Sequence, residues 1–145
     1  MSSRRAVPAA RHRAVLVALL VLLGGCVRYP TVVDIGGVNV RGENGRAVRQ
    51  GDRLLVYFDL VSTGKFGDVI TAVSAPVARR AELVDANGGV LPRFEIPGTT
   101  TVKLAPTGPH VVLTDFARPL TPRETFIVTL VLEKSGGLGV VTVVE

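Results

Sequence analysis

The 145-residue sequence contains one Cys, one Met, no Trp, two Tyr and five Phe. A single Cys excludes a scaffold held together by intramolecular disulfides. The scarcity of aromatic side chains argues against a stacking platform for sugars. No apolar run reaches the roughly 18 residues that a membrane-spanning helix requires. With 47% apolar and 20% charged residues, the chain has the composition of one folded domain and not of a disordered segment.

An excess of basic residues is confined to the beginning of the chain. The formal net charge is +5, but Arg4, Arg5, Arg11 and Arg13 all precede the first apolar run. After residue 25, 13 basic side chains face 12 acidic ones. Binding to the phosphates of nucleic acid needs a clustered excess of Lys and Arg, so we expect no nucleic-acid partner.

The first 26 residues have the organisation of an export signal. A basic segment, 1–13, is followed by ten apolar residues from Ala14 to Leu23 and then by Gly24, Gly25 and Cys26. The end of this segment, Leu-Gly-Gly-Cys, resembles a bacterial lipobox. The resemblance implies that Cys26 is acylated on sulfur, with a long-chain lipid such as palmitate, and becomes the first residue of the mature protein.

A lipid on Cys26 would anchor the protein to the outer, extracytoplasmic face of the bacterial cell membrane without spanning it. The alternative is an ordinary signal peptide that is cleaved elsewhere, with Cys26 a bystander. Export by general secretion is favoured, although Arg4-Arg5 leaves a twin-arginine route open. The predicted organisation is a signal peptide over 1–25, a lipidated Cys and tether over 26–37, and a folded domain over 38–145.

Short runs rich in Val, Thr, Ile and Phe, separated by Gly and Pro turns, fill the folded part. Alternation with a period of two is clearest over 53–62 and 125–133. The pattern predicts an all-β, immunoglobulin-like antiparallel β-sandwich of seven to nine strands. The predicted strands are 32–40, 53–62, 67–74, 79–84, 90–95, 99–105, 109–114, 125–133 and 138–144.

Residues for nucleophilic catalysis are few. After Cys26 the chain has three Ser and one His, His110, and no Gly-x-Ser-x-Gly motif. His110 and Asp115 are five residues apart, which on an extended strand places them on opposite faces. The glycines after Ser135 lack the Lys of a phosphate-binding loop and favour a hairpin turn. We therefore expect a protein that is not an enzyme.

The order of several segments resembles the periplasmic copper chaperones of the PCuAC type over roughly residues 38–145. The first half contributes Leu-Val-Tyr-Phe-Asp-Leu over 55–60, Asp-Val-Ile-Thr-Ala-Val-Ser-Ala-Pro-Val-Ala over 68–78 and Ala-Glu-Leu over 81–83. The second half contributes Phe-Glu-Ile-Pro over 94–97, the stretch 101–113 that includes His110, and Phe-Ile-Val-Thr-Leu over 126–130. This resemblance implies a cupredoxin-like β-sandwich.

The copper site of that family does not carry over fully. The resemblance implies a His after the Glu-Leu segment, a Met in the next loop and a later His-x-Met pair. Here Val84 stands at the first position, the loop is shortened to 85–89, and His110 is followed two residues on by Val112. The only Met is Met1. On this count we expect that the usual Cu(I) site is lost and that the protein carries no cofactor.

Two functions follow as hypotheses. The first is a non-catalytic binding or interaction module, anchored to the membrane through Cys26, that contacts a membrane protein complex. The alternative is a divergent metallochaperone that delivers copper to a respiratory oxidase, with His110 as metal ligand and the other ligands supplied by the partner. Otherwise His110 is a hydrogen-bonded loop residue. The candidate partner surfaces are the turn 42–51 and Arg79-Arg80.

Overall fold

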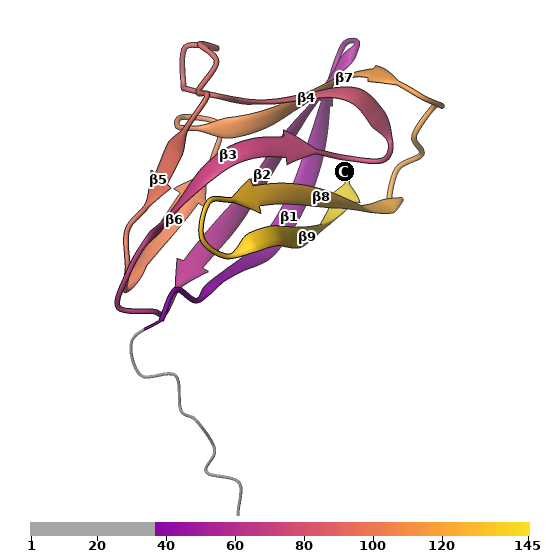
Figure 1. Ribbon diagram of the computed structural model, residues 1–145. Helices are drawn as coiled ribbons and strands as arrows, with labels where there is room; N and C mark the ends of the chain where they lie inside the picture. Colours follow the sequence, from indigo (N-terminus) through magenta and orange to yellow (C-terminus); the bar gives the residue numbers. More distant parts are fainter. Residues whose placement is uncertain (1–36) are drawn as a thin grey trace, which may run out of the picture. The chain divides into compact units, whose positions relative to one another are not determined.

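The computed structural model describes residues 37–145, which form an all-β domain (Figure 1). None of the described residues forms a helix that could cross a membrane. The nine strands are β1 (Val40–Gln50), β2 (Arg53–Ser62), β3 (Asp68–Ser74), β4 (Ala78–Val84), β5 (Phe94–Ile96), β6 (Thr100–Leu104), β7 (His110–Phe116), β8 (Thr125–Leu132) and β9 (Gly136–Val144). The predicted all-β, cupredoxin-like fold class is confirmed.

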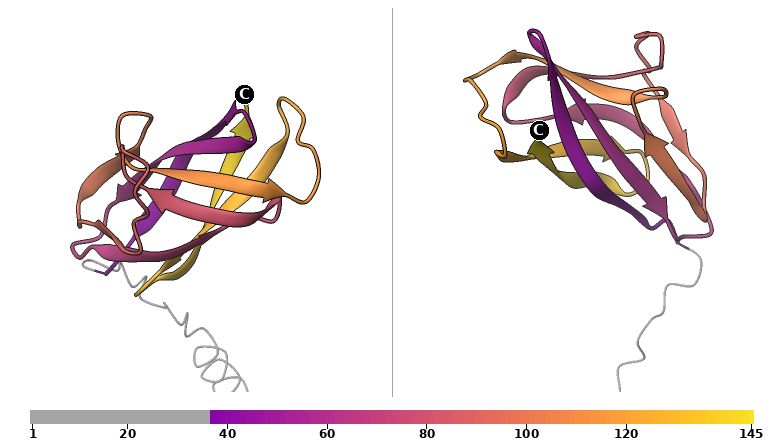
Figure 2. Two further views of the ribbon diagram at one scale, coloured as in Figure 1. Left: turned by 90° about the horizontal axis from the view of Figure 1, so that it is seen from above. Right: turned by 180° about the vertical axis from the view of Figure 1, so that it is seen from behind.

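The strands form one hydrogen-bonded sheet that curls into two layers (Figures 1 and 2). Their order is β4-β7-β2-β1-β9-β8-β3-β5, and β6 pairs with β2 beside β7. All pairs are antiparallel except β1 and β9, which run parallel. The curl brings β3, the strand next to β5 at one end of the path, into contact with β4 at the other end, and the core lies between the two layers.

Alternating apolar side chains supply that core. In β2, Leu54, Val56, Phe58 and Leu60 are buried, as the period of two predicts for a strand with one face inward. The facing layer contributes the buried side chains Phe126, Val128, Leu130 and Leu132 of β8 and Val140 and Val144 of β9. Because the inward residues of β2 and β8 fill the interior, their intervening residues are left for the two outer faces.

The first strand differs from its prediction. The sequence predicts a strand over 32–40 and a turn over 42–51, but the strand is β1, and residues 32–36 lie outside the described part of the chain. Asn44-Gly45 forms a β-bulge inside the strand, where the pairing with β2 shifts register and Asn44 adopts φ 56°. The Asn44 side chain donates a hydrogen bond to Asp59 Oδ2 at 2.8 Å. Gly45 passes the Val141 carbonyl so closely that a Cβ would lie 2.2 Å from its oxygen.

The domain has two ends, which are referred to below as proximal and distal. The proximal end holds the start of β1, the β2–β3 loop and the β5–β6 turn, where Thr63 N–H donates to Asn39 O and Thr99 N–H to Gly64 O, both at 2.9 Å. The distal end holds the β1–β2 turn, the β4–β5 connection and the β6–β7 turn (Figure 1). The strand β2 connects them, with Arg53 at the distal end and Ser62 at the proximal end.

Candidate functional site

A groove at the distal end

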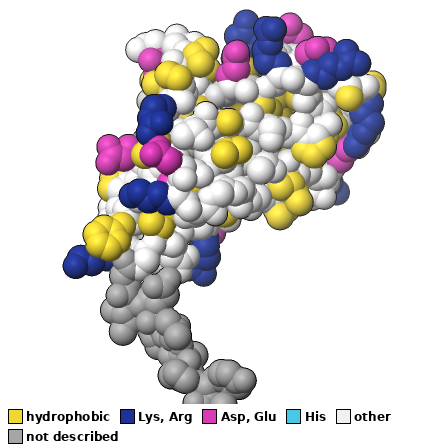
Figure 3. Space-filling model, viewed as in Figure 1, with side chains coloured by type: hydrophobic (Ala, Val, Ile, Leu, Met, Phe, Trp, Pro, Cys, Tyr) yellow, Lys and Arg dark blue, Asp and Glu magenta, His cyan; other side chains and the backbone are white. Residues whose placement is uncertain are grey.

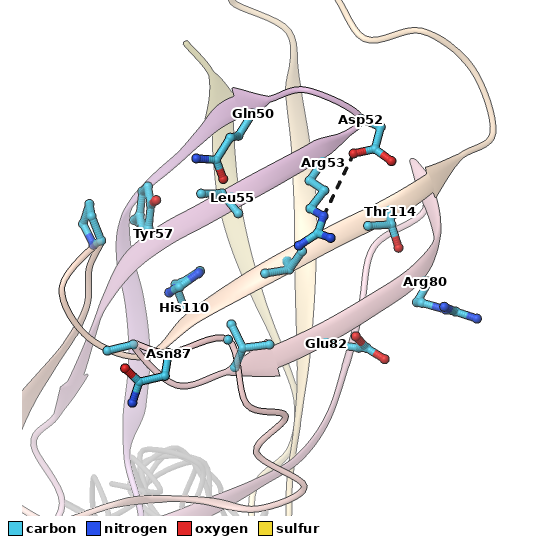
Figure 4. A pocket seen from close by; sticks show the side chains of 15 residues that line it. Gln50, Asp52, Arg53, Leu55, Tyr57, Arg80, Glu82, Asn87, His110 and Thr114 are labelled. Carbon is cyan, nitrogen blue, oxygen red and sulfur yellow. Dashed lines mark ion pairs between the residues drawn. The ribbon is translucent and has the colours of Figure 1, made fainter.

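An open groove of about 740 Å³ lies on the outer face of β2, β7 and β4 (Figure 4). Its floor is formed by outward residues of the three strands, including Leu55, Tyr57 and Val112. The β4–β5 connection and Pro106 of the β6–β7 turn border it. The groove therefore combines one apolar floor with two loop edges, and it is open enough for another molecule to reach its floor.

His110 stands at the first position of β7 and contributes to this groove. It is 9% exposed, and its ring centroid lies 5.7 Å from that of Tyr57. The His110 Nδ1 atom lies 3.0 Å from the carbonyl oxygen of Gly108. A carbonyl can only accept a hydrogen bond, so Nδ1 carries a proton, and in the neutral imidazole this tautomer has its lone pair on Nε2. This is the arrangement that commonly orients a metal-binding imidazole.

The positions that the family resemblance relates to copper converge on the same groove. Val84 of β4 is the direct cross-strand partner of His110, and Val112 lies two residues beyond it on the same face of β7. All three line the groove together with residues of the β4–β5 connection. Cross-strand neighbours have Cβ atoms about 5 Å apart, within the reach of two ligands that share a metal ion. The fold thus brings these three positions together, and two of them carry Val.

The shortened β4–β5 connection forms a closed turn. Asp85 N–H donates to Gly89 O at 2.8 Å, and Asp85 Oδ1 accepts hydrogen bonds from the N–H groups of Asn87 and Gly89, also at 2.8 Å each. Gly88 adopts φ 86°, a conformation that favours glycine. Because Oδ1 of Asp85 is engaged within its own turn, this segment supplies the groove mainly with backbone and the Asn87 side chain.

The other end of the groove is charged. It is lined by Asp52 of the β1–β2 turn, Arg53 at the start of β2, and Arg80 and Glu82 of β4 (Figure 4). Arg53 Nε lies 4.0 Å from Asp52 Oδ1, but both side chains are largely exposed, so this ion pair adds little stability. Both signs of charge are thus presented at the rim, which suits contact with a polar partner. Of these residues, the sequence patterns singled out only Arg80, as part of a candidate partner surface; its proximity to Asp52 and Arg53 depends on the fold.

Tyr57 forms the wall beside His110. Burial raises the pKa of the Tyr57 hydroxyl, and the nearby Arg46 guanidinium offsets part of this effect. The guanidinium carbon of Arg46 lies 5.8 Å from the centre of the tyrosine ring. Tyr57 is therefore a neutral phenol at physiological pH. The alternation of residues in β2 predicts that Tyr57 lies on the outer face of the strand, because its neighbours Val56 and Phe58 face the core.

The two arginines predicted as a partner surface separate. Arg79 lies 3.8 Å from Asp115 in an exposed ion pair, whereas Arg80 lines the groove. Cys26 lies outside the described residues. Between residues 37 and 145 there is no group of three or more His, Cys, Asp and Glu side chains placed to hold a metal ion. The same part of the sequence contains no Met and no Cys, so it does not provide two His and two Met.

Comparison with known proteins

Residues 37–144 match the model of a protein family described as "Putative lipoprotein LpqE-like". No curated protein sequence matches the chain. Among solved structures, the copper-bound PCuAC domain from PmoF2 is similar, with 25% sequence identity and a TM-score of 0.62. That similarity covers 77% of this chain and 94% of the PmoF2 domain.

Two further structures share the fold. The apo PCuAC domain from PmoF1 has 24% identity and a TM-score of 0.63, covering 77% of this chain and 96% of that domain. The Cu(I) form of DR1885 from Deinococcus radiodurans has 19% identity and a TM-score of 0.58, covering 96% of this chain and 94% of that one. The predicted resemblance to PCuAC-type copper chaperones is confirmed.

The prediction that the protein carries no cofactor is contradicted by the similarity to a copper-bound domain. That prediction counted the ligands of a complete four-ligand site within one chain. Such a count excludes a particular coordination set, but it does not exclude copper that is held with fewer ligands from the chain itself.

Proposed function

Because the chain belongs to the LpqE-like family, we propose that it is a lipid-anchored, extracytoplasmic protein that handles copper as cargo. It binds the metal and a partner and catalyses no reaction. The observation that carries this proposal is the geometry of His110 in the distal groove. The similarity to a copper-bound PCuAC domain supports the identity of the metal.

His110 is the copper ligand of this chain. Its Nδ1–H group donates to Gly108 O, which fixes the ring and directs the basic character to Nε2. The imidazole is packed against Tyr57 at the base of the groove, so few rotamers remain accessible to it. A prepositioned imidazole loses little conformational entropy when it binds a metal ion.

The remaining ligands come from the partner. Soft thioether and thiolate groups suit Cu(I), and residues 37–145 contain neither Met nor Cys. One protein ligand gives weak binding, so the chain holds copper firmly only while a second molecule contributes donors within the groove. The charged rim formed by Asp52, Arg53, Arg80 and Glu82 provides polar contacts for that molecule. Copper is thus passed by exchange of ligands inside a transient complex.

The lipid anchor on Cys26 is part of the same proposal. The family description, which names a lipoprotein, supports it, and so does the lipobox-like end of the signal segment. An anchored domain stays close to membrane complexes that receive copper, which raises its effective concentration near them. Mass spectrometry of the protein extracted from membranes tests the anchor, because acylation adds a defined mass to a peptide that begins with Cys26.

The test of copper handling is a Cu(I) titration in competition with a chromophoric chelator. The chain carries Cys26→Ser, so that a free thiol cannot bind copper. Titrations are run with Cu(I) alone and with Cu(I) plus a short peptide that contains two methionines. We expect weak binding in the first case and a ternary complex in the second. His110→Ala abolishes the ternary complex, and Thr114→Ala, a control in the same groove, leaves it intact.

A ternary complex that survives His110→Ala would remove His110 from the coordination set. Absence of any complex with the peptide, in a chain that remains folded by circular dichroism, would contradict the copper function. A tight one-to-one complex without the peptide would show that this chain supplies enough ligands by itself.

A further inference from the structure

An exposed aromatic side chain marks the proximal end of the domain. Phe66, in the β2–β3 loop, is 55% exposed and lies apart from the buried core. The Nζ atom of its neighbour Lys65 lies 5.7 Å from the centre of the phenyl ring. An exposed Phe costs solvation free energy unless something covers it, so this position is a candidate for contact with another phase or molecule.

Close packing of glycines holds Phe66 outward. The backbones of Gly64, Gly67 and Gly98 approach neighbouring segments so closely that an added Cβ would meet a backbone oxygen at 2.0, 2.2 and 2.3 Å, respectively. These close approaches leave no room for a side chain at the three glycine positions. Thr99 N–H donates to Gly64 O at 2.9 Å and ties the β5–β6 turn to the loop. Phe66 is therefore exposed from a loop whose backbone is tightly packed against its neighbours.

The same loop lies where the chain enters the domain. A Cβ on Gly64 would lie 2.0 Å from the carbonyl oxygen of Gly37, so the loop contacts the first described residue. Gly37 lies eleven positions after Cys26 in the sequence. Fully extended, these eleven steps span at most about 40 Å. A lipid on Cys26 would thus keep the Phe66 loop within a short distance of the bilayer surface.

Lysine side chains lie beside Phe66 at the proximal end. Lys65 precedes Phe66 within the loop, and Lys134 Nζ donates to Gly67 O at 2.9 Å. Among the carboxylates near the loop, Asp68 accepts three backbone hydrogen bonds and Glu133 forms an ion pair with Arg93, while Glu95 of β5 is exposed. Figure 3 shows an exposed hydrophobic side chain next to Lys or Arg side chains at the end of the domain where the β2–β3 loop lies, with Asp or Glu side chains further along the same side.

We propose that the β2–β3 loop docks on the outer leaflet of the membrane, with Phe66 at the level of the headgroups and Lys65 against anionic phosphates. Aromatic rings and lysines are the side chains that stabilise proteins at this interface. The docking rests on the proposed lipid anchor, which supplies a high local concentration of bilayer. It orients the domain, because β2 then directs the groove at the distal end away from the membrane.

The absence of Trp provides a direct test. Phe66→Trp creates the only Trp in the chain, and its emission reports whether the loop enters an apolar environment. The matched control is Val90→Trp, a position that is 58% exposed in the β4–β5 connection at the distal end (Figure 1). Both variants are prepared as the full lipidated chain and as an unlipidated chain with Cys26→Ser. Vesicles contain phosphatidylcholine and phosphatidylglycerol, with brominated acyl chains as quenchers.

On vesicles, the lipidated Phe66→Trp protein is expected to show a blue shift and quenching by bromine, whereas the Val90→Trp protein shows neither. In the unlipidated background, Phe66→Ser and Lys65→Gln each lower partitioning into anionic vesicles by about fivefold relative to the unlipidated parent chain. Neutral vesicles remove the effect of Lys65→Gln and retain that of Phe66→Ser.

Flotation with vesicles separates this proposal from the anchor. If the lipidated Phe66→Trp protein floats but its emission is unchanged, the anchor holds and the docking is refuted. If the chain lacks a lipid but the Cys26→Ser, Phe66→Trp protein shows a blue shift with anionic vesicles, the docking holds and the anchor is refuted. If Val90→Trp responds as strongly as Phe66→Trp, the proposed orientation is wrong.

Discussion

Asp68 is the residue whose removal should test the structural reasoning most sharply. Its carboxylate is 2% exposed, and it receives three backbone hydrogen bonds. Oδ1 accepts from Val69 N–H at 2.8 Å and from Lys134 N–H at 2.9 Å, and Oδ2 accepts from Ser135 N–H at 2.9 Å. The carboxylate thus fixes the beginning of β3 to the β8–β9 turn. No other side-chain acceptor is seen on these three N–H groups in the described structure.

The expected magnitude follows from those bonds. A hydrogen bond to a charged acceptor contributes about 1.5 kcal/mol to net stability, so Asp68→Ala should lower the free energy of unfolding by about 4 kcal/mol. In Asp68→Asn the amide oxygen can still accept from Val69 and Lys134, but the amide nitrogen then faces the Ser135 N–H. This variant should lose about 2 kcal/mol. Both values are large against the 5–15 kcal/mol that is typical of a whole domain.

Urea unfolding of the Cys26→Ser chain, followed by circular dichroism, measures both variants against their parent. The reasoning is refuted if Asp68→Ala costs less than about 1 kcal/mol, or if Asp68→Asn is as damaging as Asp68→Ala.

Burial alone would raise the pKa of Asp68, but the hydrogen bonds from Ser135, Lys134 and Val69 outweigh it and lower the pKa below its usual 3.8. Its stabilisation is therefore complete above pH 3.8 and is lost as the pH falls through the folded pKa. Asp68→Asn should flatten that part of the stability profile.

Three further predictions concern the groove, acid stability and the proximal end. The double variant Val84→His, Val112→Met places a second imidazole and a thioether beside His110. Competition titration with Cu(I) should therefore show tight binding without added peptide. Weak binding, unchanged from the parent chain, would contradict the cross-strand geometry. Hydrogen bonding with Arg118 lowers the pKa of Glu124 to about 2. The Glu124 carboxylate therefore stabilises the fold above pH 4.5, and this stabilisation is lost as the pH falls towards 2. In Glu124→Gln the melting temperature should depend less on pH in that range. Gly98→Ala should lower the free energy of unfolding by about 2 kcal/mol, because the added Cβ would lie 2.3 Å from a backbone oxygen. Urea unfolding measures this change. An unchanged free energy of unfolding would refute the tight packing of the Phe66 loop.

Most strands could be predicted because their sequences alternate. The range 53–62 is the range of β2, and 67–74 and 125–133 each extend β3 and β8 by one residue. From Leu54 to Leu60 in β2 and throughout β8 every second side chain is apolar and buried, whereas β3 places the polar Asp68 on the inward face beside Ile70. In β2 and β8 the positions that the sequence pattern predicts to face the core are the positions that are buried in the structure.

The strand β1 could not be predicted in this way. It contains Arg41, Glu43, Arg46 and Arg49, and its Asn44-Gly45 pair is typical of a turn. What makes it a strand is pairing on both sides, with β2 and with β9, which is a property of the folded molecule. The strand predicted over 90–95 is likewise displaced: Val90 forms only an isolated bridge with Val84, and β5 begins at Phe94.

The candidate site was predicted in part. The family resemblance related Val84, His110 and Val112 to one site, and the structure places all three on one groove. The hydrogen bond between His110 and Gly108 depends on the side-chain rotamer and on the β6–β7 turn, which residue spacing does not determine. The expectation that no cofactor is carried failed because ligands were counted within one chain.

The strand β1 also determines how the domain would respond to mechanical load. It starts at the proximal end, runs for 11 residues and pairs with β2 antiparallel and with β9 parallel. A partner that holds the groove while the N-terminal chain is pulled would load these pairings along the strand axis. In such a shear geometry the hydrogen bonds bear force together, whereas a strand pulled sideways would lose them one at a time. A pull along the axis of β1 would therefore meet more resistance than a pull across it.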